Sequence, residues 1–452
     1  MPGRFRSNNP QAPDDPDAAG AAARAAADGG AEVPWWQQLA EDFASRPEPF
    51  DHLLRDRLLV GSTASIDVMV RTAAASMVAG LALPLGYRPS QLRRDLDDAR
   101  MYTDLADSGD PQRFFAAPPA GVPVSERVPG WPHFRTRDGH CADLSFASPY
   151  FPLNASIRDG YLGHRANRTA HARYWSHDDG PRPTIIAIHG FGAESYWLNE
   201  WFFALPWLYA FGCDVLLFTL PFHGPRKSLL SPFSGHGFFA QGLAGINEAF
   251  GQAICDLRVF FDWLRDVRGV RRIGVTGVSL GGYTAALLAS VEPRLQFSIP
   301  NVPVTSIADL VLEWQPMGVA VQALMRRYNR SVTEIRHVLA VACPLTYPPV
   351  LPRERLMIVG GAGDRMAPPK HSRLLWEHWD QPSMHWFPGS HLLHLDRGAY
   401  LMEMARFMTG IGFVERRSGD RREAGERRRG NGVASTERRR GSDRRGPEDR
   451  RS

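Results

Sequence analysis

Cysteine is scarce in this chain, and the cysteines present are too scattered to build a site. The 452 residues include four, Cys141, Cys213, Cys255 and Cys343, and no C-x-x-C pair. This spacing argues against a cysteine-ligated zinc site and against a disulfide framework. The sequence therefore gives no sign of a cysteine-built metal site or of a disulfide-stapled protein.

Long uninterrupted apolar runs are also missing, as is the apolar core of a secretion signal near the N-terminus. The most apolar segment, residues 66–85, contains Asp67 and Arg71, so its uncharged part is 14 residues long. A membrane-spanning helix needs about 20 mainly apolar residues. We interpret the segment as a helix packed on the protein, with a membrane-surface helix as the alternative. We expect a cytoplasmic protein.

Surplus charge is absent from most of the chain, although the net charge is +5. Residues 415–452 hold 14 Arg and 8 Asp or Glu, whereas the remainder holds 39 basic and 40 acidic residues. The main body thus has no cationic character that would indicate specific nucleic-acid binding. We expect the Arg-rich tail to be disordered and solvated, with weak contact to anionic surfaces as the alternative.

Composition divides the chain into four parts. Residues 1–34, rich in Ala, Gly, Pro and Asp, are predicted to be disordered. Residues 35–139 are predicted to form a helical extension that ends in a proline-rich strap. Residues 140–412 are predicted to form the main domain, and residues 413–452 the disordered tail.

The main domain alternates short β-rich runs with helical runs. Strands are predicted at 142–148, 170–176, 183–190, 213–220, 271–277, 297–304, 356–363 and 383–389, and helices at 195–210, 243–265, 280–290 and 396–409. Such alternation predicts an α/β fold with a mostly parallel, twisted sheet and helices on both faces. Residues 305–345 interrupt the pattern and are predicted to form a small helical cap, a candidate lid over an acyl pocket.

The strongest motif is Gly277-Val278-Ser279-Leu280-Gly281, which lies between a predicted buried strand and a predicted helix. Small residues on either side of Ser279 permit a tight turn that projects its hydroxyl, beside a helix N-terminus. This arrangement resembles the nucleophile elbow of the α/β-hydrolase superfamily, over roughly residues 140–410. There is also a loose resemblance to a poorly characterised group of α/β-hydrolase-domain proteins.

The resemblance implies the chain order Ser, acid, His. The acid is expected at Asp364, directly after the predicted strand 356–363, with Asp309 as the reserve candidate. The base is expected at His391, in a small-residue loop after the last predicted strand. His385 and His394 are the alternatives for this base.

The resemblance also implies two backbone N–H donors for an oxyanion. These are expected at Leu280 and at Phe191, with Gly192 as the alternate, while His189 is expected to hold the loop. His223 and Arg226, in the motif LPFHGPR, are candidate substrate contacts. The alternative for that motif is a turn whose Arg pairs with a surface acid.

These residues together predict a serine hydrolase that cleaves a small-molecule carboxylic ester, or a related acyl bond, through an acyl-enzyme. This chemistry calls for no cofactor and no metal. An acyltransferase that uses the same triad is one alternative. A non-catalytic binding protein on the same scaffold is another, although such a protein would usually lack a triad member.

Overall fold

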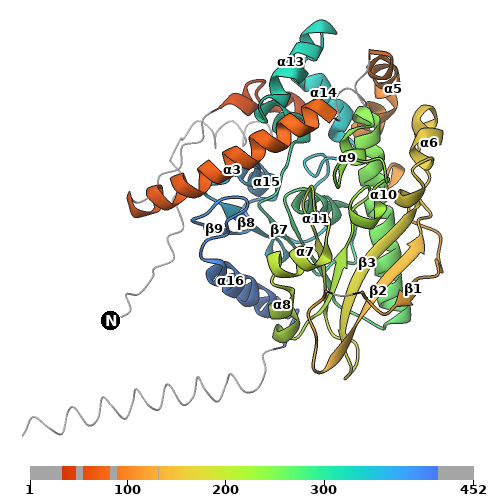
Figure 1. Cartoon of the computed structure of the whole chain (residues 1–452), viewed down its shortest axis with the longest axis vertical. Coiled ribbons are helices and arrows are strands. Elements are labelled where there is room, and N and C mark those ends of the chain that lie inside the picture. Colours follow the sequence, from red (N-terminus) through yellow and green to blue (C-terminus); the bar gives the residue numbers. More distant parts are fainter. Residues whose placement is uncertain (1–32, 47–53, 82–88, 131, 416–452) are drawn as a thin grey trace, which may run out of the picture.

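The computed structural model describes residues 33–46, 54–81, 89–130 and 132–415, and a single sheet runs through its centre (Figure 1). Within these residues the sheet has nine strands in the order β1-β2-β3-β5-β4-β6-β7-β8-β9. The strands are β1 (Ser125–Arg127), β2 (Gly139–Ala147), β3 (Thr169–His177), β4 (Thr184–Ile188), β5 (Asp214–Phe218), β6 (Ile273–Val278), β7 (Phe297–Asn301), β8 (Met357–Gly361) and β9 (Ser383–Phe387).

The sheet changes character from one edge to the other. From β5 through β4, β6, β7 and β8 to β9 each neighbouring pair is parallel. At the other edge β1, β2 and β3 pair antiparallel, and β3 joins β5 antiparallel. The prediction of a mostly parallel α/β sheet is therefore confirmed. One strand was missed, because β1 lies within the segment expected to be an irregular strap.

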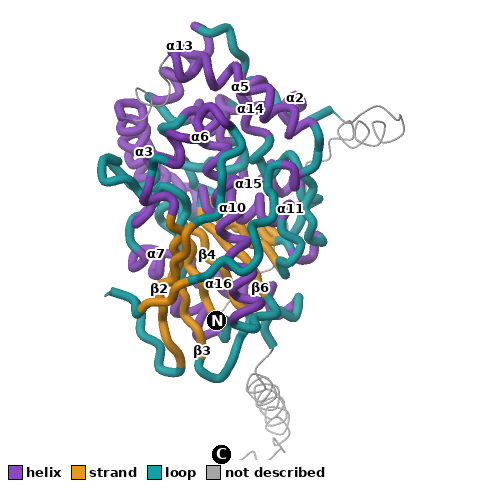
Figure 2. The backbone as a smooth tube through the Cα atoms, turned by 90° about the vertical axis from the view of Figure 1, so that its right-hand side faces the viewer, coloured by secondary structure: helices purple, strands orange, loops and turns teal. Residues whose placement is uncertain are grey.

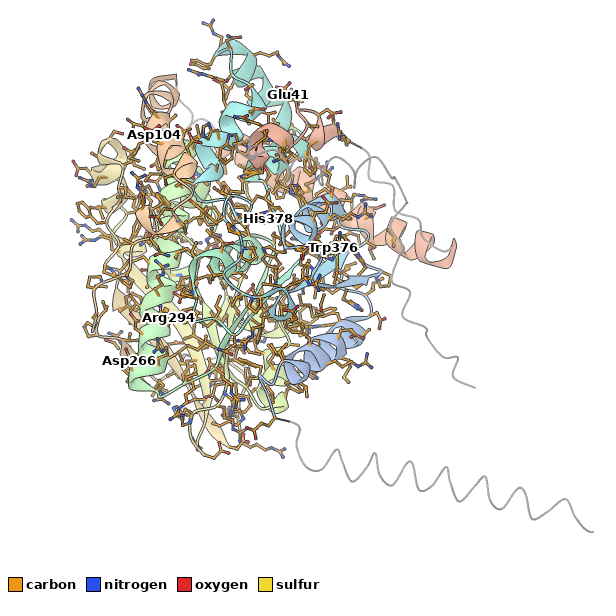
Figure 3. The ribbon with its side chains drawn as sticks, turned by 180° about the vertical axis from the view of Figure 1, so that it is seen from behind. Glu41, Asp104, Asp266, Arg294, Trp376 and His378 are labelled. Carbon is orange, nitrogen blue, oxygen red and sulfur yellow. The ribbon has the colours of Figure 1, made fainter. Side chains whose placement is uncertain are left out.

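Helices cover both faces of the sheet, as predicted. On one face α10 (Gly242–Asp262), α11 (Leu280–Val291) and α15 (Pro369–His378) contribute to the larger apolar core. On the other face α8 (Leu205–Phe211) and α16 (Arg397–Gly410) contribute to a second core. In the view from behind, Trp376 and His378 mark α15, and Arg294 marks the loop after α11 (Figure 3).

The helix expected over residues 195–210 is wrong in one respect, because the structure breaks it in two. α7 (Tyr196–Phe202) ends before Ala204, which adopts a left-handed φ of 51°, and α8 begins at Leu205. Pro206 explains the break, since a proline within a helix lacks the amide hydrogen and clashes with the carbonyl of the preceding turn.

The remaining helices gather beyond one end of the strands. Figure 2 shows α2, α5, α13 and α14 together above the sheet. The N-terminal part contributes α2 (Trp35–Gln38), α3 (Leu54–Leu81) and α5 (Pro89–Asp107), the main domain adds α6 (Ala155–Leu162) and α9 (His236–Phe239), and the insertion forms α12 (Ile307–Glu313), α13 (Met317–Arg327) and α14 (Val332–Ala340). The insertion is thus helical, as predicted.

Candidate active site

Ser279 lies at the sharp turn between β6 and α11, in a backbone conformation that L-residues rarely adopt, with φ 58° and ψ −115°. The turn depends on glycine at both flanking positions. A Cβ atom on Gly277 would collide with the Gly281 carbonyl, and one on Gly281 would collide with the Ile188 carbonyl. The Ser279 amide donates to Asn301 O at 3.0 Å, which ties the turn to β7. The sequence thus builds a strained, glycine-dependent turn that presents one hydroxyl.

Asp364 and His391 come together from two successive loops at the carboxyl ends of β8 and β9. His391 Nδ1 donates to Asp364 Oδ2 at 2.6 Å, and both side chains are buried. The other oxygen of Asp364 accepts from the amides of Met366 at 2.8 Å and Ala367 at 2.7 Å. These bonds fix the carboxylate, which in turn leaves Nε2 as the free nitrogen of the imidazole.

The protonation of His391 is set by opposing effects. Burial by itself lowers the pKa of His391, but the charge and hydrogen bond of Asp364, together with the charge of Asp67, outweigh burial and raise that pKa above its ordinary value. The carboxylates thus make the imidazole a better proton acceptor.

No hydrogen bond joins Ser279 to His391 within the residues that the structure describes. Such contacts are often long in ligand-free enzymes and shorten when substrate binds.

Ser279 opens onto a cavity of about 120 Å³ whose lining is almost entirely apolar. Ser279 is the one hydroxyl-bearing residue in that lining. The apolar walls come from α3, α9, α10 and, above all, the insertion: Val78, Phe239, Leu243, Ile246, Val304, Ile307, Ala308, Leu310, Val311, Leu312, Trp314, Met317, Val321, Met325, Val332, Ile335 and Leu339. An apolar group of a ligand would therefore contact the insertion while its reactive end faces Ser279.

Leu280 and Phe191 line the same cavity beside Ser279. Across the described chain, neither backbone amide donates a hydrogen bond to another residue. The loop that carries Phe191 is held by His189, whose Nε2 accepts from the Leu220 amide at 3.1 Å. Burial lowers the pKa of His189 to about 4, so this imidazole stays neutral near pH 7 and serves as an acceptor. Two N–H groups without an acceptor thus line the same cavity as Ser279, whose side chain is partly exposed, and an oxyanion hole needs donors of this kind.

Sequence comparison points in the same direction. The family model described as "Alpha/beta hydrolase domain containing 18" matches residues 134–314, a range that includes Phe191 and Ser279 but ends before Asp364 and His391. Over this range the chain is similar to the α/β-hydrolase domain that the model describes. The similarity supports a hydrolase in general terms, without a specific substrate.

Two curated relatives, the uncharacterized proteins Rv2627c and MT2702 from two strains of Mycobacterium tuberculosis, are each 29% identical over 289 residues. The match covers 62% of this chain and 66% of each relative, so it spans slightly less than two thirds of their length. Among solved structures, acetyl xylan esterase 1 from Thermoanaerobacterium sp. JW/SL YS485 shares 16% identity over 70% of this chain and 94% of that one, with a TM-score of 0.49. The acetyl xylan esterase from Paenibacillus sp. R4 shares 15% identity over 73% and 98%, with a TM-score of 0.47.

Asp67 is a residue of this site that sequence reasoning missed. It lies on α3, which is bonded to the loops that follow β8 and β9, and its side chain is fully buried. The Asp67 carboxylate accepts from the amides of His391 at 2.7 Å, Leu392 at 3.3 Å and Arg365 at 3.1 Å. One available signal was that Asp67 and Arg71 are the only charges between residues 60 and 81. A charge in an otherwise apolar helix indicates a buried partner.

The alternatives for the acid and the base lie elsewhere. Asp309 forms a fully buried pair with Arg336, with oxygen–nitrogen distances of 2.6 and 3.0 Å, so it is not the partner of His391. His394 Nε2 bonds to the His391 carbonyl at 3.1 Å and thereby supports the loop. His385 lies within β9, as expected.

The expectation that His223 and Arg226 contact a substrate needs correction. Both side chains are fully buried, and neither lines the cavity at Ser279. Arg226 Nη2 bonds to Asp256 Oδ2 at 2.7 Å and to the Asn167 carbonyl at 3.0 Å, which makes it a structural cross-link. The His223 ring packs 5.9 Å from the Phe191 ring, behind the loop with the unpaired amide. The alternative, a turn whose Arg pairs with a surface acid, is correct about the pairing, but the acid, Asp256, is buried.

Proposed function

We propose that this protein is a serine hydrolase that cleaves a carboxylic ester through an acyl-enzyme formed on Ser279. The observation that carries the proposal is the 2.6 Å bond between His391 and Asp364, in loops that follow β8 and β9, in a chain whose serine lies at a strained elbow. Each position agrees with the order Ser, acid, His that this superfamily uses.

In the proposed reaction His391 Nε2 removes the proton of Ser279 Oγ as that oxygen attacks the ester carbonyl carbon. The carbonyl oxygen becomes an oxyanion, which accepts hydrogen bonds from the amides of Leu280 and Phe191. His391 then returns the proton to the leaving alcohol as the carbon–oxygen bond breaks. Water, activated by the same imidazole, attacks the acyl-enzyme and releases the acid and free Ser279.

The acyl group is proposed to be apolar, because the walls of the cavity beside Ser279 offer carbon atoms rather than hydrogen-bonding groups. Burial of each methylene in such a cavity contributes about 0.8 kcal/mol. Hydrolysis of p-nitrophenyl esters of increasing acyl length is expected to show rising kcat/KM until the cavity is filled.

The deciding experiment compares the wild-type protein with Ser279→Ala. A fluorophosphonate probe should label the wild type, and the variant should lose both labelling and turnover, the latter by about 10⁴- to 10⁶-fold. Ser290→Ala is the matched control, because Ser290 is a buried serine of α11 whose hydroxyl only donates to the Tyr347 carbonyl. Equal labelling of the wild type and Ser279→Ala would overturn the proposal.

A further inference from the structure

Helix α3 belongs to the N-terminal extension, yet it is bonded to both loops that carry the proposed acid and base. Besides the three amides that donate to Asp67, Arg71 Nη1 donates to the Arg365 carbonyl at 2.7 Å. Val60, near the start of the same face, packs against Gly363, where a Cβ atom would lie 3.1 Å from Val60 atoms. One face of α3 thus contacts the Asp364 loop and the His391 loop together.

We propose that Asp67 is a positioning residue, whose carboxylate sets the separation between the loop of Asp364 and the loop of His391. This inference rests on the proposed function. Its physical basis is that a buried carboxylate forms strong, charge-assisted hydrogen bonds with N–H donors. The three donors to Asp67 come from both loops, so the carboxylate holds one loop against the other. A displacement of about 1 Å between reacting groups is enough to slow an enzyme about 10²-fold.

The charges around His391 determine how the pKa of its imidazole would respond if the charge of Asp67 were removed. Asp364 faces the imidazole from the loop after β8, Asp67 from α3, and His394 from its own loop. Arg71 interacts electrostatically with both of these carboxylates, with Glu313 and with Arg365. Removing the negative charge of Asp67 should therefore lower the pKa of His391 and move the acidic limb of the pH–rate profile to lower pH, in addition to slowing turnover.

The test is the variant Asp67→Asn, which keeps the size of the side chain and removes its charge. We expect kcat to fall by about 10- to 100-fold with little change in KM, and the acidic limb to shift to lower pH. Asp107→Asn is the matched control, because Asp107 lies on α5 and bonds to His337 at the surface. It should change neither kcat nor the limb.

Active-site titration with the fluorophosphonate probe counts the folded sites, so a variant that folds poorly is still measured per active molecule. A purely structural role for Asp67 would lower the melting temperature while kcat per site and the limb stay unchanged, and this result would overturn the inference. Activity that survives Ser279→Ala would instead contradict the proposed function, so the two failures are distinguishable.

The opposite face of α3 carries a second, independent observation. Between residues 60 and 81 the only charged residues, Asp67 and Arg71, point toward the protein, so the exposed face has no charge. That face consists of Gly61, Ser62, Ser65, Ile66, Val68, Met69, Val70, Thr72, Ala73, Ser76, Met77, Gly80 and Leu81. This distribution is the reverse of a water-facing helix, whose polar side is outward.

Three hydroxyls on this face donate to carbonyls of the helix itself. Ser65 Oγ donates to the Gly61 carbonyl at 3.0 Å, Thr72 Oγ1 to Val68 O at 2.7 Å, and Ser76 Oγ to Thr72 O at 2.8 Å. With these back-bonds the three hydroxyls need no partner outside the helix, so lipid can surround them without leaving a donor unsatisfied. Residues 60–81 are also long and apolar enough to cross a membrane by length and composition, but the bonds of the inner face attach them to the domain.

We infer that the outer face of α3 docks on a lipid bilayer and lies parallel to its surface. The inference does not depend on the proposed chemistry. Because the face is uncharged, attachment should not depend on anionic lipid. Co-sedimentation with phosphatidylcholine vesicles in about 1 M NaCl, where the Debye length is about 3 Å, removes any contribution from the Arg-rich tail.

The full chain should bind these vesicles, and Met69→Glu combined with Met77→Glu should weaken partitioning at least about tenfold, equivalent to about 1.4 kcal/mol. The control is Val128→Glu, an apolar-to-acidic change at an exposed residue next to β1, at the opposite edge of the sheet from β9. Absence of vesicle binding by the full chain would overturn the inference. A wild-type dimer in light scattering that the double variant converts to a monomer would overturn it too, since a second copy would then cover the face.

Discussion

Two buried carboxylates in this molecule differ in the partner each one holds. Asp256 pairs with Arg226 at 2.7 Å, and Asp364 pairs with His391 at 2.6 Å. A guanidinium keeps its proton at every relevant pH, whereas an imidazole gains and loses one near neutrality. The first pair is therefore a fixed cross-link. The second is able to move a proton, and it lies at the edge of the sheet where Ser279 and the apolar cavity are found.

The largest expected effect concerns the acid that holds the imidazole. Asp364→Asn should lower kcat about 10⁴-fold, because the amide no longer fixes the imidazole tautomer or stabilises its cation. The measurement is turnover of a p-nitrophenyl ester together with circular dichroism to verify folding. Asp309→Asn probes the reserve acid; it breaks the pair with Arg336, so it should reduce stability and leave turnover per active site nearly intact. If kcat of the Asp364 variant fell by less than tenfold, the pair of Asp364 and His391 would not be catalytic, and it would not differ in role from the pair of Asp256 and Arg226.

The second prediction concerns the pair that cannot exchange a proton. Arg226→Met leaves Asp256 buried without its cation, and breaking such a pair costs about 3–5 kcal/mol of unfolding free energy. Urea denaturation measures this loss. Turnover per active site should stay unchanged.

The double variant Arg226→Met with Asp256→Leu removes both charges and should recover much of the stability, because no unpaired charge remains in the interior. A different outcome would restore the substrate-contact role: if Arg226→Met raised KM strongly while the denaturation midpoint stayed in place, the buried pair would not be structural.

The third prediction concerns the protonation of His391, because the imidazole titrates near neutral pH whereas the Arg226 guanidinium does not. The reaction needs neutral His391 as the base, and the pKa of that imidazole is raised, so kcat/KM should increase with pH through an apparent pKa above about 6.5. The same shift favours the protonated folded state. Its stabilisation is fully present below about pH 6.5 and is lost as pH rises through the higher folded-state value. A pH–rate profile whose acidic limb lies below pH 6 would contradict this direction.

The elements that sequence predicted well are those whose signal is local. Ile246 to Leu264 repeat at helical spacing and form α10 with its continuation, and Ser279 lies at its elbow because Gly277 and Gly281 leave room for it. Asp364 and His391 were located through the chain order of a resemblance, 27 residues apart.

What the sequence could not provide depends on distant contacts. Asp67 and His391 are 324 residues apart, and no periodicity links α3 to a loop after β9. The burial of Arg226 depends in the same way on Asn167 and Asp256, from other elements of the fold. Local motifs therefore predict the candidate residues. Tertiary packing decides which partner each charged side chain has, and the sequence did not predict that.

The smallest expected effect tests the apolar cavity that Ser279 lines. Ala308 lines this cavity on α12, and Ala308→Phe should fill part of its volume of about 120 Å³. We expect kcat/KM for a p-nitrophenyl octanoate to fall about tenfold while the acetate ester is hardly affected, since each excluded methylene forfeits about 0.8 kcal/mol of burial. Val350→Phe is the control, because Val350 is exposed and lies outside the cavity. An equal decrease for both esters would show that the cavity does not receive the acyl chain, and the apolar lining beside Ser279 would then be ordinary core.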